Sequence, residues 1–396
     1  MTRGWALLAI VTAACGPPIP PPPAAPMPVL TTDWQPVIGF LDSAVATGAA
    51  PGAVLGVTHD GNRFVYGTGR LGQDEAERPG ATTIYDLASL TKVVGLATAA
   101  MLAVDDGKLD LDAPVQRYVP GFAGPGKERV TVRMLLAHTS GLPGWRPLFR
   151  EVATRDEALA LADSTPLDSA PGTAEIYSDL GAIVLTQVIE AVYHQRLDSL
   201  LEQRVLQPLL MTSTRYLPSP AWRDRIAPTE LDPWRGRVLR GEVHDENAAL
   251  MDGVSGHAGL FGSAEDLLTF AEWMLGQAHG RTGGRSKHSH QPSDRPTVRP
   301  SVLGEFTRRQ NLVPGSSRAL GWDTPTPTGS AGTMLSPSSF GHTGFTGTSL
   351  WIDPEHRVAI VLLSNRVNPT RAHARWTPVR GAIADLVMTT LFQDAR

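Results

Sequence analysis

A serine and a lysine three positions apart open one of the most apolar stretches of this 396-residue sequence. Ser89-Leu90-Thr91-Lys92 is followed by VVGLATAAMLAV, and the pattern predicts a helix over 89–105. Positions i and i+3 share a helix face, so Lys92 would lie beside Ser89. A serine hydroxyl becomes a good nucleophile when a base takes its proton, and desolvation moves a lysine pKa toward neutrality. Alone, the motif is more typical of a capping serine.

A tyrosine is the second group that could take part in such chemistry. Tyr177-Ser178-Asp179 opens the apolar stretch LGAIVLTQVIEAVY, which predicts a helix over 179–194. A buried Tyr177 near Lys92 could relay a proton to a leaving group, because a neighbouring cation favours the phenolate. Taken alone, this segment is more typical of a helix start capped by Ser178 or Asp179.

A glycine-rich segment, GHTGFTG at 341–347, is the third. Its small residues lie on a strand-like run and let the backbone of a sheet edge approach a ligand closely. The backbone N–H of Phe345 could join that of Ser89, at a helix start, in stabilising an oxyanion. Thr343 could hydrogen-bond a substrate carboxylate. The alternative is a glycine-rich turn with a structural role only.

Other polar and aromatic residues favour structural roles. The helix at 131–137 stops in LLAHTSGL, and we assign His138 no catalytic role. Packing is the expected role of three tryptophans that could also line the site: Trp145, Trp322 and Trp351. His244, Asp245 and His257 could suggest metal ligands, but no H-E-x-x-H spacing occurs, and we expect neither a metal nor a cofactor.

The elements that would position these residues are strands at both chain ends and helices between them. Strand patterns occur at 53–59, 63–66, 339–345, 348–352 and 357–363, and Asp60-Gly61 is typical of a hairpin turn. Further helices are expected at 33–46, where Asp33 could cap, at 264–275, capped by Ser263, and at 371–392. This pattern predicts an α/β fold of the α+β type, in which one antiparallel sheet from both chain ends carries flanking helices. A mostly helical lobe at about 93–275 would complete the site, and the polar stretch at about 276–300 is an exposed insertion.

The first 31 residues carry an export pattern. Residues 1–15 combine an early arginine, an apolar run and small residues before Cys15, the single cysteine of the chain. This resembles a bacterial lipoprotein signal, in which the cysteine is acylated; an ordinary cleaved signal is the alternative. The proline-rich residues 16–31 are typical of a stiff tether. We therefore expect an exported protein, periplasmic or at the cell surface, that meets a membrane only through a lipid on Cys15.

Composition bounds the partners. Hydrophobic residues make up 42% and charged residues 19% of the chain, as in ordinary globular proteins. A formal net charge of −4 gives no reason to expect nucleic acid as a partner. A small molecule or a peptidoglycan fragment is the expected ligand, and the sequence does not indicate an oligomeric state.

In this order, the three segments resemble the penicillin-recognising serine hydrolases of the class C β-lactamase and penicillin-binding protein family. The likeness covers roughly residues 35–394, within a hydrolase domain at 32–394. It implies Ser89 as nucleophile, proton transfer by Lys92 and Tyr177, and an oxyanion hole of the Ser89 and Phe345 N–H groups. It also implies substrate binding by four residues: Asp179, His342, Thr343 and Gly344.

Two departures bear on the substrate. His342-Thr343-Gly344 stands where the family often has Lys-Thr-Gly, and a histidine is mostly neutral near pH 7. Asp179 stands where asparagine is frequent, and an ionised carboxylate only accepts hydrogen bonds; it could pair with Lys92 or receive an amino group. Both changes weaken the case for β-lactam turnover. We expect hydrolysis of peptidoglycan-derived or D-amino-acid amides through a Ser89 acyl-enzyme, with a small-ester hydrolase, a β-lactamase or a non-catalytic sensor of wall fragments as alternatives.

Overall fold

A five-stranded antiparallel sheet is the centre of the fold in the computed structural model, which describes residues 32–279, 295–372 and 374–392. Its strand order is β2-β1-β10-β9-β8. The strands are β1 (Gly52–His59), β2 (Asn62–Gly69), β8 (Phe340–Thr343), β9 (Ser349–Asp353) and β10 (Val358–Ser364). β1 pairs with β10, so the two chain ends meet inside one sheet, as the sequence predicts.

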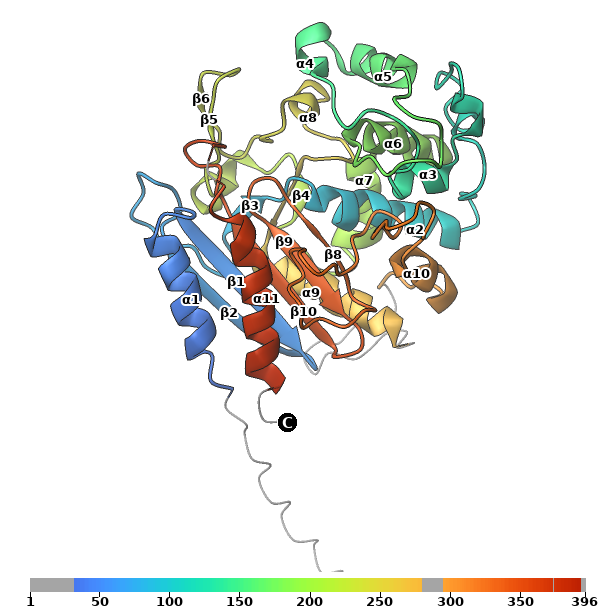
Figure 1. Ribbon diagram of the computed structural model, residues 1–396. Helices are drawn as coiled ribbons and strands as arrows, with labels where there is room; N and C mark the ends of the chain where they lie inside the picture. The colour runs from blue at the N-terminus through green and yellow to red at the C-terminus, as the bar shows by residue number, and fades with distance from the viewer. Residues whose placement is uncertain (1–31, 280–294, 373, 393–396) are drawn as a thin grey trace, which may run out of the picture. The chain divides into compact units, whose positions relative to one another are not determined.

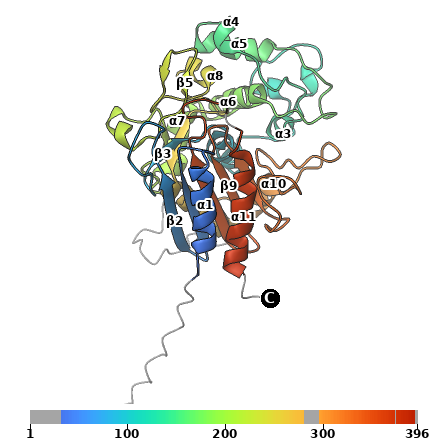
Figure 2. The same cartoon turned by 60° about the vertical axis from the view of Figure 1, so that its left-hand side comes forward.

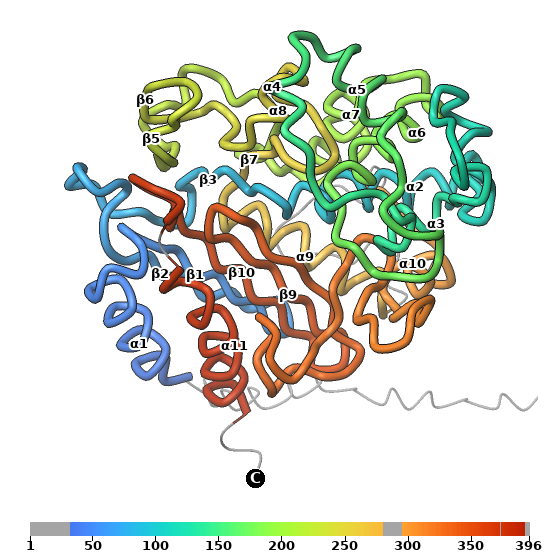
Figure 3. The backbone as a smooth tube through the Cα atoms, turned by 45° about the horizontal axis from the view of Figure 1, so that its top comes forward, coloured from blue at the N-terminus to red at the C-terminus, as the bar shows by residue number. Residues whose placement is uncertain are grey.

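Helices cover both faces of this sheet. On one face, α1 (Gln35–Ala46) and α11 (Thr377–Phe392) lie side by side (Figures 1 and 2). The other face packs against α9 (Ala264–Ala278), which contacts β1, β9 and β10 (Figure 3). The strands of the sheet interior are buried on both sides, and their burial supplies much of the apolar core.

The middle of the chain supplies helices and two small sheets. The helices of this region are α2 (Thr98–Asp105), α3 (Val132–Leu136), α4 (Leu148–Glu151), α5 (Arg155–Ser164), α6 (Asp179–Tyr193), α7 (Leu197–Leu201) and α8 (Glu246–Leu250). One small sheet has the order β3-β7-β4, from Ile84–Asp86, Leu260–Ser263 and Arg215–Tyr216. The other is the hairpin of β5 (Leu231–Asp232) and β6 (Arg237–Val238). A last helix, α10 (Pro300–Thr307), contacts α2 and α9.

Most expected elements are present, and local differences have simple causes. The hairpin at Asp60-Gly61 forms with both residues at positive φ. Ser178 and Ser263 cap α6 and α9 through their side chains. The first helix begins after Trp34, without a side-chain cap and with proline in its first turn, so Asp33 is not its N-cap. The small sheets were not predicted, because strands of two to four residues carry too few positions to show an alternation.

The predicted signal, the lipidated Cys15 and the tether fall on residues 1–31, outside the described residues, as does most of the predicted insertion at 276–300. Within the described part, no helix has the length and apolarity needed to cross a bilayer.

Candidate active site

The nucleophile loop is held in a strained turn. Ala88, directly before Ser89, has a φ of 47°, a conformation that costs a residue with a Cβ about 1 kcal/mol. The buried Asp86 carboxylate holds it there by accepting the Ala88 N–H at 2.8 Å. Thr346 and Thr348, in the turn between β8 and β9, donate their hydroxyls to the Asp86 and Leu87 carbonyls at 2.7 and 3.0 Å. The turn therefore points Ser89 at the edge of the large sheet.

The helix after Ser89 departs from α geometry. Lys92–Ala97 form a π-helix before α2 begins at Thr98, whose hydroxyl donates to the Val93 carbonyl five residues back. Such π segments often occur at functional sites. The sequence predicted a continuous helix here, since π geometry leaves the apolar pattern intact.

Lys92 lies at the centre of the polar contacts around Ser89. Its ammonium donates to Ser89 Oγ at 3.1 Å and to the His257 carbonyl at 3.0 Å, and lies 2.7 Å from Asp179 Oδ1. The side chain is only 2% exposed. Burial is the largest single influence and lowers the Lys92 pKa, but Asp179 and Tyr177 together outweigh it and hold the pKa above its ordinary value. Desolvation therefore does not bring the Lys92 pKa down to neutrality in the free enzyme, because the pairing with Asp179, one of the two roles considered for that residue, is present.

Tyr177 approaches the same point from the start of α6. Its ring centroid lies 4.9 Å from Lys92 Nζ, and its buried hydroxyl lacks a partner with good hydrogen-bond geometry among the described residues. Burial raises the Tyr177 pKa, while Lys92 and the Ser89 hydroxyl act in the opposite direction. Loose contacts of this kind are common before substrate binds. The serine, lysine and tyrosine do come together.

His138 positions the tyrosine. Its Nδ1 accepts the Ser178 N–H at 3.1 Å, and its ring lies 4.7 Å from that of Tyr177. Burial, with Arg318 and Lys92 nearby, keeps the His138 pKa well below its usual value. A neutral histidine that accepts a backbone proton orients its neighbour, which agrees with the structural role assigned from sequence.

The candidate oxyanion donors are backbone amides on two segments. Among the described residues, neither the Ser89 N–H nor the Phe345 N–H has a hydrogen-bond partner. Gly344 packs so closely on the nucleophile loop that a Cβ would lie 2.5 Å from the Leu87 carbonyl oxygen. The carbonyls of Gly344 and Phe345 accept from Arg380 at 2.6 Å and Arg366 at 2.9 Å, which fixes the peptide planes. This geometry suits two N–H groups aimed at one developing charge.

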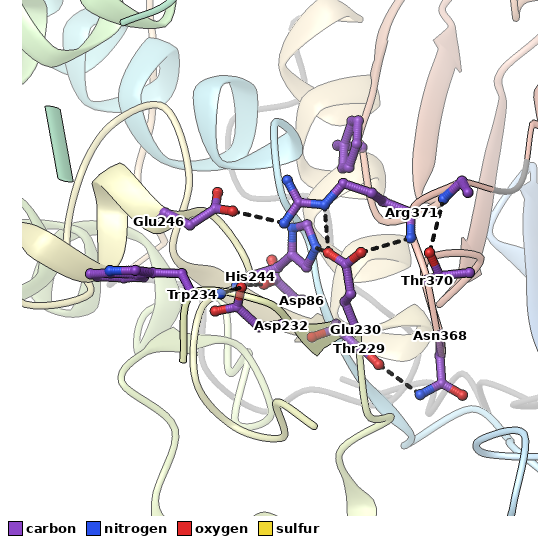
Figure 4. Close-up of polar contacts among 12 residues, drawn as sticks. Asp86, Thr229, Glu230, Asp232, Trp234, His244, Glu246, Asn368, Thr370 and Arg371 are labelled. Carbon is purple, nitrogen blue, oxygen red and sulfur yellow. Dashed lines mark hydrogen bonds and ion pairs between the residues drawn. The ribbon is translucent and has the colours of Figure 1, made fainter. Parts of the chain in front are cut away.

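A network of polar side chains contacts Asp86, in the turn before Ser89 (Figure 4). The sequence did not predict this network. His244 donates its backbone N–H to Asp86 at 2.7 Å, and its ring stacks on Phe345 at 5.7 Å. Its Nε2 meets Glu230 at 2.9 Å, and Arg371 in turn donates to Glu230 at 2.5 Å (Figure 4). The network joins the Asp86 turn to the Phe345 ring, so it positions both oxyanion donors.

His342 lies on β8, at the place of the family lysine. Its Nδ1 lies 2.7 Å from the Thr343 carbonyl, and its Nε2 is buried without a partner among the described residues. Burial lowers its pKa to about 4, helped by the charges of Arg318 and Lys92. His342 is therefore neutral at pH 7. Thr343 is half-buried beside it on the same edge strand.

Arg318 is the other cation near this strand. Its guanidinium lies 5.1 Å from the Tyr177 ring centroid, and it pairs with Glu175 at 2.9 Å and with Asp323. Both cations near His342 are thus balanced by carboxylates, Lys92 by Asp179 and Arg318 by two acids. The described residues include no group of three or more acidic, histidine or cysteine side chains that could hold a metal.

A serine on a strained turn before a helix, a lysine and a tyrosine beside it, and two nearby segments with backbone amides that lack partners among the described residues are the parts expected of a serine hydrolase site. The profile of the family described as Beta-lactamase matches residues 37–384. The chain belongs to that family.

Similar proteins agree with this assignment. An N-acetylmuramyl-L-alanine amidase from Bacillus subtilis is 32% identical over 353 residues, which cover 80% of this chain and 77% of the amidase. A putative D-alanyl-D-alanine carboxypeptidase from Escherichia coli is 33% identical over 329 residues, 75% of this chain and 72% of its own. A class C β-lactamase from Rhodobacter sphaeroides has the same fold, with a TM-score of 0.66, 21% identity and coverage of 90% and 99%.

Proposed function

We propose that this chain is a cell-envelope amidase that cleaves peptidoglycan-derived or D-amino-acid amide bonds through a Ser89 acyl-enzyme. The observation that carries the proposal is the Lys92 ammonium 3.1 Å from Ser89 Oγ, next to the unpaired Ser89 and Phe345 amides. The names of two relatives at 32% and 33% identity, a muramyl amidase and a putative D,D-carboxypeptidase, support a wall-derived substrate.

The proton route follows from the charge of Lys92. A protonated lysine accepts the Ser89 proton only if it passes one of its own to Asp179, whose Oδ1 lies 2.7 Å away. Ser89 Oγ then bonds to the carbonyl carbon, and the oxyanion forms against the two amides. As the C–N bond breaks, Tyr177 gives its proton to the leaving amine and recovers one from the Lys92–Asp179 pair. Water releases the acyl group by the reverse route.

The charges near β8 favour a substrate without a free carboxylate at that position. His342 is neutral at pH 7 because its pKa is about 4, and Arg318 is already paired with Glu175 and Asp323. A terminal carboxylate would find no unbalanced cation among these residues to compensate its desolvation. This favours an amidase over a D,D-carboxypeptidase or a β-lactamase, whose substrates carry such a group.

The experiment has two stages. Wild-type protein incubated with a fluorophosphonate should gain the reagent mass on Ser89, and Ser89→Ala should not; an unmodified wild type at high excess would contradict the mechanism. The enzyme is then given matched wall peptides whose C-terminus is either a free carboxylate or an amide. We expect a higher kcat/KM for the amide form, whereas preference for the free acid would refute the proposed selectivity. A single acylation without turnover would indicate a sensor.

The envelope location is proposed on the names of the relatives and on residues 1–15. Metabolic labelling with a fatty-acid analogue should tag the wild-type chain and not Cys15→Ala. Export of an unlabelled protein would favour the ordinary cleaved signal.

A further inference from the structure

Three aromatic side chains from two segments lie next to one another and form what we call the aromatic platform: Trp145, Phe149 and Trp234. Trp145 and Trp234 are 51% and 46% exposed, whereas Phe149 is buried between them. Ring centroids lie 6.5 Å apart for Trp145 and Phe149 and 5.0 Å apart for Phe149 and Trp234. Exposed indoles that share one buried support are a recognisable mark of a binding surface.

The segment that carries Trp145 and Phe149 is fixed in place. The Asn247 side chain, at the start of α8, accepts the Phe149 N–H at 3.1 Å and donates to the Arg146 carbonyl at 2.8 Å. Asn247 is itself 1% exposed. The backbone that carries the two rings is therefore held in place before any ligand binds, which reduces the entropy lost on binding.

Trp234 is fixed independently, at the tip of the β5–β6 hairpin. The fully buried Asp232 accepts the Trp234 N–H at 3.0 Å and pairs with Arg235. Arg235 also donates to the Val243 and His244 carbonyls, each at 2.8 Å. The indole extends away from His244 and Glu230, at the end of the polar network (Figure 4).

The platform adjoins the reacting residues. The Asp179 N–H donates to the Gly144 carbonyl at 2.8 Å, so the residue before Trp145 is bonded to the catalytic segment. Gly144 also packs on Tyr177, since a Cβ there would lie 3.1 Å from the Tyr177 carbonyl oxygen. A substrate that reaches Ser89 past Tyr177 would therefore pass beside Trp145.

An exposed donor lies at the border of the platform. The Arg150 guanidinium lies 5.2 Å from the Phe149 ring centroid. The Arg235 guanidinium lies 5.4 Å from Trp234 but is largely occupied by Asp232, Glu242 and two backbone carbonyls. A pyranose ring matches this surface, because its axial C–H groups form an apolar face that stacks on indole and its rim of hydroxyl and acetamido oxygens accepts from guanidinium. Leu231 and Val238 on the same hairpin are also exposed, so an apolar protein surface is the competing occupant.

We infer that the aromatic platform is a saccharide subsite that binds the amino-sugar part of a wall-derived substrate. The inference rests on the proposed function and deepens it: the substrate class becomes a glycan-linked amide rather than a free peptide.

The experiment compares two amides that share the same peptide and differ only by a linked N-acetylglucosaminyl-N-acetylmuramic acid disaccharide. The readout is the ratio of their kcat/KM values, in which any general loss of activity cancels. Trp145→Ala and Trp234→Ala should each lower the preference for the sugar-bearing amide by about tenfold, mostly through KM. The matched control is Trp34→Ala, which removes a partly exposed indole stacked on Phe64, in the α1 region, and should keep the wild-type ratio.

A binding measurement separates failure of the platform from failure of the proposed function. The peptide-free disaccharide is titrated into Ser89→Ala protein, and tryptophan fluorescence and calorimetry follow binding. Saturable binding that Trp145→Ala weakens supports the subsite even if no amide is cleaved. No binding, or an unchanged ratio in an enzyme that does cleave amides, overturns the subsite and leaves the amidase proposal intact.

Discussion

Two serine clusters lie on either side of Lys92, and only one is built for catalysis. Ser255 Oγ lies 2.7 Å from His257 Nδ1, and His257 Nε2 lies 2.8 Å from Asp245. By residue type and distance this resembles the serine–histidine–aspartate chain of many hydrolases, but the ring nitrogens are exchanged, since in those enzymes the serine meets Nε2 and the aspartate meets Nδ1. Ser89, by contrast, has a lysine and a tyrosine beside it.

Accessibility decides between the two. Ser255 and His257 are each 1% exposed, so no substrate reaches them. Ser89 is half-buried, and its own N–H and that of Phe345 lack partners among the described residues. The His257 carbonyl accepts from Lys92 at 3.0 Å, so the buried chain holds the lysine of the active one. A serine can therefore act as a nucleophile only where substrate can reach it and oxyanion donors lie nearby, in addition to a base.

The largest expected effect separates the serines directly. Ser89→Ala should lower kcat for an activated ester by about 10⁴-fold or more, because the bond-forming oxygen is lost. Ser255→Ala should keep kcat within about threefold and lower the free energy of unfolding by about 1 kcal/mol through one lost hydrogen bond. Ester hydrolysis and thermal unfolding of both variants measure this; a Ser255→Ala enzyme as inactive as Ser89→Ala would break the comparison.

The second prediction tests Asp179 as the proton acceptor. Asp179→Asn leaves an oxygen near Lys92 but removes the negative charge, so kcat for an amide should fall by about 10²-fold. The pH–rate profile should also shift to lower pH, because the Lys92 pKa falls without the paired carboxylate. Steady-state kinetics from pH 5 to pH 9 checks both. An equal or higher kcat would mean that Asp179 serves only to contact substrate.

The large sheet could be predicted from the sequence, and so could the grouping of Lys92 and Tyr177 around Ser89, because the elements that carry them are long or clearly marked. β1, β10 and α6 are long enough to carry several turns or alternations, and Asp60-Gly61 and Ser178 mark their ends. The three motifs around Ser89 also follow one another along the chain in the same order as in the family, and several such matches in one order are not expected by chance.

What the sequence left open depends on contacts across the fold. Burial lowers the Lys92 pKa and the Asp179 carboxylate raises it, and the 2.7 Å contact with that carboxylate joins residues 87 positions apart. Nor does any local pattern indicate that His244 would stack on Phe345 or that Glu230 would meet Arg371. The exposed Trp145, assigned to packing, differs from the buried Trp322 and Trp351 only in its surroundings.

The third prediction concerns the stability of the buried chain. Burial opposes the Asp245 charge, but His257 and the Ala248 N–H hold the Asp245 pKa well below its usual range. A depressed carboxyl pKa contributes stability above the unfolded pKa and loses it as pH falls toward the folded value. Asp245→Asn should therefore cost about 3 kcal/mol of unfolding free energy at pH 7 and less at pH 3. Denaturant unfolding at both pH values measures this, and a pH-independent difference would exclude the charge as the cause.

The smallest expected effect is at His342. This residue differs from Lys92 across the active site, because Lys92 keeps its charge next to a carboxylate and burial keeps His342 neutral. Because the His342 pKa is about 4, affinity for a carboxylate-bearing substrate analogue should stay flat from pH 7.5 to about pH 5.5 and strengthen only as pH approaches 4. His342→Lys should raise that affinity about threefold at pH 7, since a lysine stays charged there. Titration of the analogue into Ser89→Ala protein gives the profile. An increase in affinity centred near pH 6.5 would mean that His342 is solvated when the analogue is bound. That result would favour a substrate with a free carboxylate.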